Sequence, residues 1–280
     1  MSRPQGPVGP ADYAEPKCLL STETYGSAPE VKPVPQRRII EKVNDYMSRR
    51  DYAGVERHLN YWLAEARLGR DLRGELTIRN EFIGHYRKVG DREKALENIS
   101  EALALVDALD FGNSKSGAVT YINAGTALSA FDENERALEL FEKAQRIMEP
   151  APDSDPYVLG GLYNNMGLAC VAMGRYAKAY ALYDRAILIM KKVPNGCLEE
   201  AITLLNIANA KEYELGLEPA EEEIGKLLEK AFMLLEEPDV PHDGYYAFVC
   251  EKCAPTYSYY GFFADAAELE RRAEEIYERS

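Results

Sequence analysis

Histidine and cysteine are scarce in this 280-residue chain, so few side chains are available for catalysis or metal binding. The three histidines are His58, His85 and His242, and none belongs to the His-Glu-x-x-His pattern of a zinc protease. The chain also lacks a Gly-x-Ser-x-Gly nucleophile turn and a dinucleotide-binding glycine fingerprint. Segment 112–117 is no phosphate loop, because no glycine directly precedes its lysine. These absences predict a non-enzymatic protein without a cofactor.

The cysteines form a small, odd-numbered and scattered set, which favours reduced thiols in a cytoplasmic protein over a disulfide framework. They are Cys18, Cys170, Cys197, Cys250 and Cys253. The last two form a Cys-x-x-Cys pair, but zinc needs four ligands and only His242 lies near enough in sequence to be a third. We therefore expect no metal here and interpret the pair as buried structural thiols.

Positive charge and long apolar runs are also lacking. The 33 Lys and Arg are outnumbered by 47 Asp and Glu, for a formal net charge of -14. This balance disfavours nucleic acid and anionic membranes as partners, since both attract clustered basic residues. No apolar run reaches the roughly 18–20 residues of a membrane span, and the N-terminus shows no secretory signal. A cytoplasmic location is expected.

Residues 1–36 differ in composition from the rest of the chain. Seven of the 15 prolines lie there, together with three glycines. Such a composition cannot form a packed helix, so we expect an extended or disordered tail. Its one apolar patch, Cys18-Leu19-Leu20, leaves open a second interpretation, in which the tail docks on the remaining chain and occupies a groove there.

What the chain does contain is a repeat. Segments 90–95, 132–137 and 174–179 share one pattern, and their alanines Ala95, Ala137 and Ala179 are each 42 residues apart. Each segment leads into a helical face that alternates small and large apolar residues. Self-similarity at such a period predicts a solenoid.

Helical periodicity and turn residues predict six helix pairs. The expected helices are 37–48 with 51–67, 75–89 with 92–110, 117–130 with 133–149, 157–173 with 176–192, 198–214 with 219–236, and 243–259 with 263–278. Gly90, Gly174 and Gly261 are placed to end first helices, where a left-handed residue is needed.

Residues 121–125 and 163–167, with the small and large residues that follow each, resemble tetratricopeptide repeats. The 42-residue spacing is similar to the kinesin-light-chain type. The resemblance implies an all-α, right-handed α-α superhelix over residues 37–280, with first helices lining a concave groove. It implies a protein or peptide partner and a scaffold or adaptor function. The alternative is a sensor of a small signalling peptide that lacks its own DNA-binding domain.

Both ends depart from the repeat pattern. The first pair carries Val55, Leu59 and Trp62 where small residues are expected, and the fifth shows a three-residue insertion near 217–219. Pro255 is expected to kink the first helix of the sixth pair. That pair is rich in aromatic residues, of which about half should pack and the rest form an association surface. The end surface makes homodimerisation through a terminal repeat a further expectation.

Asn123, Asn165 and Asn206 share one position of successive first helices. An amide offers both a donor and an acceptor, so a row of asparagines could bind the backbone of an extended peptide. Solvated or helix-to-helix hydrogen-bonded asparagines are the alternative. A carboxylate clamp is not expected, because only Arg87 and Lys88 supply suitable charge. The other groove candidates are Asn80, Ile122, Thr126, Asn164, Leu168, Asn209 and Tyr213.

Overall fold

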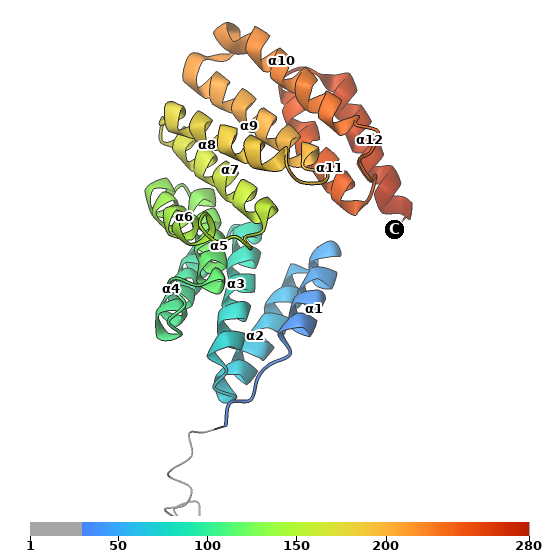
Figure 1. The fold of residues 1–280 in the computed structure, drawn as a ribbon. Coiled ribbons are helices and arrows are strands. Elements are labelled where there is room, and N and C mark those ends of the chain that lie inside the picture. Colours follow the sequence, from blue (N-terminus) through green and yellow to red (C-terminus); the bar gives the residue numbers. More distant parts are fainter. Residues whose placement is uncertain (1–29, 280) are drawn as a thin grey trace, which may run out of the picture.

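The computed structural model describes residues 30–279, and this part of the chain consists of helices joined by short turns (Figure 1). Twelve helices lie within it as six hairpins. They are α1 (Gln36–Ser48) with α2 (Tyr52–Leu68), α3 (Leu72–Val89) with α4 (Arg92–Ala108), α5 (Lys115–Ala130) with α6 (Asn134–Met148), α7 (Pro156–Ala172) with α8 (Tyr176–Met190), α9 (Cys197–Leu215) with α10 (Leu217–Leu235), and α11 (Gly244–Tyr259) with α12 (Phe263–Arg279).

The hairpins stack into a curved superhelix in which the first helix of each pair lies on the inner side. Each first helix contacts the first helix of the next hairpin, from α1 and α3 through to α9 and α11 (Figure 1). The second helices lie on the outer side. The predicted all-α superhelix is confirmed, and every predicted helix boundary lies within three residues of the observed one.

Backbone with a positive φ angle recurs at the end of the first helices with the period of the sequence. Gly90, Asp132, Gly174 and Gly216 are 42 residues apart and have φ angles of 77°, 64°, 69° and 86°. Glycine adopts this region without a steric penalty, and aspartate is one of the few other residues that tolerate it. The chain therefore reverses direction at the same point of four successive hairpins.

In the third and fourth hairpins, a glycine of the first helix lies directly beneath an aromatic ring of the second helix. A Cβ added to Gly125 would lie 2.6 Å from the ring of Phe141, and one added to Gly167 would lie 2.3 Å from the ring of Tyr183. Both rings are fully buried. The glycines thus allow these two hairpins to close around one large side chain each, which explains the small-and-large alternation of their sequence.

The predicted insertion in the fifth pair is helical. Residues 217–219 form the first turn of α10, and Gly216 alone separates it from α9, so both helices extend to 19 residues. Pro219 fits because the first turn of a helix needs no backbone donor there. In the sixth pair, α11 continues through Pro255 as a single helix.

Residues 30–35 precede α1 and run along the first hairpin. The backbone N–H of Lys32 donates to the Gly69 carbonyl at 2.9 Å, and that of Val34 donates to Asp71 Oδ2 at 2.9 Å. The last part of the proline-rich segment is therefore docked on the turn between α2 and α3. The predicted patch 18–20 lies outside the described residues, so its occupation of a groove stays a prediction.

We expect Gly167→Ala to lower the free energy of unfolding by about 1–3 kcal/mol, because the new methyl group overpacks against Tyr183. Gly161→Ala on the same helix is the matched control, since its Cβ would meet nothing within 4 Å. This control should gain about 0.5–1 kcal/mol from the lower chain entropy of alanine. Urea unfolding followed by circular dichroism measures both. Equal effects of the two changes would contradict the packing argument.

Candidate functional site

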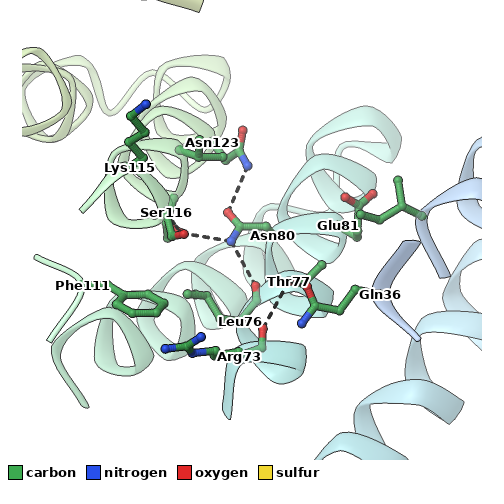
Figure 2. A pocket seen from close by; sticks show the side chains of 13 residues that line it. Gln36, Arg73, Leu76, Thr77, Asn80, Glu81, Phe111, Lys115, Ser116 and Asn123 are labelled. Carbon is green, nitrogen blue, oxygen red and sulfur yellow. Dashed lines mark hydrogen bonds between the residues drawn. The ribbon is translucent and has the colours of Figure 1, made fainter. Parts of the chain in front are cut away.

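Asparagine and threonine side chains link the first helices of the second and third hairpins. The Asn80 amide on α3 donates from Nδ2 to Thr120 Oγ1 of α5 at 3.0 Å. In return, Asn123 of α5 donates from Nδ2 to Asn80 Oδ1 at 3.0 Å (Figure 2). Asn80 is thus held by a threonine and an asparagine three positions apart on the neighbouring helix.

The same arrangement occurs between α7 and α9. Asn164 donates to Thr203 Oγ1 at 2.9 Å, and Asn206 donates to Asn164 Oδ1 at 3.1 Å. Thr203 and Asn206 are again three positions apart. Asn164 is only 6% exposed, so these bonds satisfy a polar group that would otherwise be buried without partners.

Between α5 and α7 this linkage is interrupted. Ile122 stands one 42-residue period before Asn164, and its apolar side chain cannot accept a hydrogen bond. Asn165 donates instead to Thr126 Oγ1 at 3.2 Å. The predicted asparagine row is therefore not continuous. The Asn-Thr-Asn linkage joins α3 to α5 and α7 to α9, whereas a single Asn165–Thr126 bond joins α5 to α7.

All three asparagines of the row donate to a neighbouring first helix, as the second of the two interpretations expected. Each amide nevertheless keeps unused capacity. Within residues 30–279, the Oδ1 atoms of Asn123 and Asn206 accept no hydrogen bond. Peptide binding by the row stays a prediction.

Only part of the row borders a hollow. Two adjoining cavities of about 550 and 350 Å³ lie between α1, α3 and α5, and both are lined by Asn80, Glu81 and Asn123 (Figure 2). Thr126 lines the smaller one. We call these joined cavities the N-terminal groove. Their size is that of ordinary ligand-binding clefts.

Glu81 is the acidic residue of the N-terminal groove, and burial raises the pKa of its carboxyl group. It makes no ion pair or hydrogen bond with the residues that the structure describes. The cations that line the groove with it are Arg73 and Lys115 in the larger cavity, and Arg87 and Lys88 in the smaller one. The Arg73 guanidinium lies 5.4 Å from the centre of the Phe111 ring, and Lys115 pairs with Asp153. The groove thus carries charges of both signs.

A separate hollow of about 580 Å³ lies between α9 and α11 and the turn into α10, and we call it the C-terminal pocket. It brings together two predicted site residues, Asn209 and Tyr213. The remaining candidates line neither hollow: Leu168 is exposed and Ile122 half-buried, while Asn164, Asn165 and Asn206 make the bonds described above.

Two notable residues were missed by the sequence reasoning. Glu81 precedes Asn123 by 42 residues, so the period itself would have placed it in the row. Arg79 precedes Tyr121 by the same interval and is 4% exposed. It donates to Asn98 Oδ1 at 2.7 Å and pairs with Glu75 at 3.6 Å. Arg79 could have been found from the sequence, because it is a charged residue at a repeat position that is otherwise apolar.

The Cys-x-x-Cys pair lies inside α11. Both thiols are buried, and burial raises the pKa of Cys250 and raises that of Cys253 to about 12. Such thiols are poor nucleophiles, because the thiolate is the reactive form. Across residues 30–279, no cluster of three His, Cys, Asp or Glu is arranged to hold a metal ion. None of the helices found there is long and apolar enough to cross a membrane.

Asn164→Ala should lower the free energy of unfolding by about 1–3 kcal/mol, because it leaves buried groups of the neighbouring helix without partners. Asn60→Ala is the control: Asn60 is exposed on α2 and bonds only within its own helix. Urea denaturation at neutral pH compares the two. Similar losses in both variants would contradict an inter-repeat role for Asn164.

Glu81→Gln should raise the stability of the protein at neutral pH, because the folded state raises the pKa of this carboxyl group by burying it. A folded pKa above the unfolded one means that stability falls as pH rises between the two values. The gain of the variant should therefore be complete at neutral pH and vanish below the unfolded pKa, near 4.3. Thermal melting temperatures across this pH range measure it, and a gain that persists at low pH would contradict the explanation.

Comparison with known proteins agrees with this architecture. A family model described as tetratricopeptide repeat matches residues 75–149 and 159–229, which is just over half of the chain. No curated protein matches the sequence of this chain.

Among solved structures, a protein from Podosopora anserina assigned as a kinesin light chain with nearly identical TPR-like repeats has a TM-score of 0.59 at 17% identity, over 72% of this chain and 97% of that one. A single-residue variant of the same protein has a TM-score of 0.60 at 17% identity, over 71% and 93%. BtubC from P. vanneervenii has a TM-score of 0.48 at 14% identity, over 88% and 92%. At these identities the likeness concerns the fold alone. The sequence match, on hairpins that stack as described above, shows that this chain belongs to the tetratricopeptide repeat family.

Proposed function

We propose that this chain is a non-enzymatic scaffold that binds a peptide segment of a protein partner in the N-terminal groove. The family supports a general protein-interaction function, because stacked repeats form an extended concave surface. The observation that carries the finer proposal is the position of Asn80 and Asn123 in the wall of that groove. Asn165 and Asn206, the other members of the row, line neither this groove nor the C-terminal pocket.

The side chains around these amides suit an extended backbone. Asn123 has a free Oδ1 acceptor and a second amide hydrogen, which match the N–H and C=O of a peptide unit. Thr77, Thr120 and Thr126 add hydroxyl groups along the same helices. Ile40 and Val119 supply apolar surface for side chains of the peptide. The groove is thus suited to hydrogen-bond the main chain of a peptide with little selectivity for its side chains.

Buried thiols support a reducing, cytoplasmic environment for this function. Self-association through the terminal hairpin would use exposed side chains such as Phe263, which is 69% exposed.

Selection from a displayed library of random peptides against the full chain provides ligands for the test. Peptides that compete with one another for a single site should bind Asn123→Ala about tenfold more weakly, the cost of losing hydrogen bonds in a desolvated contact. Asn206→Ala is the matched control, because it removes the equivalent amide bond to Asn164 away from this groove. Fluorescence anisotropy measures the affinities. Unchanged binding by Asn123→Ala, or the absence of any enriched peptide, would contradict the proposal.

A further inference from the structure

The C-terminal pocket differs in chemistry from the N-terminal groove. Its walls come from two first helices: Asn209, Glu212 and Tyr213 lie on α9, and Tyr259 lies on α11. The turn residue Gly216 closes one side. Because these helices belong to adjacent hairpins, the pocket lies along the same inner side of the superhelix as the N-terminal groove.

Tyrosine hydroxyl groups orient the carboxylate of Glu212 from two sides. Tyr259 donates to Oε1 at 2.7 Å, and Tyr260 donates to Oε2 at 2.8 Å. The carboxylate raises the pKa of Tyr259, and burial together with the same carboxylate raises that of Tyr260, so both remain donors at neutral pH. Each carboxylate oxygen has a further lone-pair direction available for another donor.

Glu212 is the only charged residue in the wall of the pocket, and it has no cationic partner among residues 30–279. Lys211 is adjacent in sequence but pairs with Glu223 at 3.1 Å and lies 4.7 Å from the centre of the Tyr180 ring. The pocket is therefore negative and lacks a counter-charge. A chain with a net charge of -14 adds a long-range field of the same sign.

Exposed aromatic rings border this carboxylate. Tyr213 is 72% exposed and Tyr259 is 67% exposed. Tyr259 and Tyr260 meet edge to face, with centroids 5.0 Å apart. Aromatic faces attract cations, and guanidinium groups stack on them more readily than ammonium groups do.

We propose that the C-terminal pocket binds an arginine side chain of the partner peptide, with the guanidinium group forked onto Glu212 and stacked on an exposed tyrosine. The planar guanidinium group can donate to both carboxylate oxygens of Glu212 at once, whereas a lysine ammonium would donate to one at a time. This inference rests on the proposed function and deepens it, because it assigns a side-chain preference to the same inner surface.

The test uses N-acetyl-arginine methylamide as the probe, titrated into the full chain and followed by saturation-transfer NMR. Its citrulline analogue has nearly the same shape but no charge. We expect saturable binding of the arginine probe, about tenfold weaker binding of the citrulline probe, and a similar loss in Glu212→Gln. Glu214→Gln is the matched control, because Glu214 also lies on α9 and accepts a tyrosine hydroxyl, that of Tyr180 at 2.7 Å, but lies outside the pocket.

Three results would overturn the assignment: no saturable binding of the arginine probe, equal binding of the citrulline probe, or equal losses in Glu212→Gln and Glu214→Gln. A lysine probe that binds as well as arginine would overturn the choice of guanidinium. These outcomes are separate from the peptide experiment. Selected peptides that depend on Asn123 but not on Glu212 would leave the proposed function intact and remove this pocket from it.

Discussion

In the third and fourth hairpins, the fold depends on the contact between a glycine of the first helix and a large ring of the second helix. Gly125 beneath Phe141 and Gly167 beneath Tyr183 leave no room for a methyl group. Because this close approach recurs after 42 residues, these two hairpins close in nearly the same geometry. A curved stack with an inner and an outer side is the consequence.

The inner side of the first helices combines polar side chains with apolar ones such as Ile40 and Val119. There, Asn80 and Asn164 accept from an asparagine of the next first helix and donate to its threonine, which links neighbouring repeats by side-chain hydrogen bonds. Such bonds contribute modest net energy but are costly to leave unmade. Where Ile122 replaces the asparagine, the amide of Asn165 turns to Thr126 instead.

The two ends of the inner surface consequently offer different chemistry. Near α1, α3 and α5, amides and hydroxyl groups surround a groove with charges of both signs. In the C-terminal pocket between α9 and α11, the one carboxylate of the wall accepts from two tyrosine hydroxyls and is bordered by exposed rings. A partner that spans both would pair its backbone at one end and present a cationic side chain at the other. Both hollows are lined by residues of the first helices, which lie on the inner side of the stack (Figure 1).

The repeat period, the six hairpins and the helix boundaries were determined by the sequence, because small-and-large alternation and left-handed turn residues are local features. The period also placed Asn123 and Asn165 at one repeat position, whereas Asn206 follows Asn165 after 41 residues and corresponds by the period to Asn164. Which amides pair, and which border a hollow, was decided by the tertiary structure, since these depend on the distance between helices some 40 residues apart in the chain. The tertiary structure likewise decided the roles of Glu81 and Glu212. The burial of Glu81, and the lack of a cation beside Glu212 among residues 30–279, depend on segments that are distant in the chain.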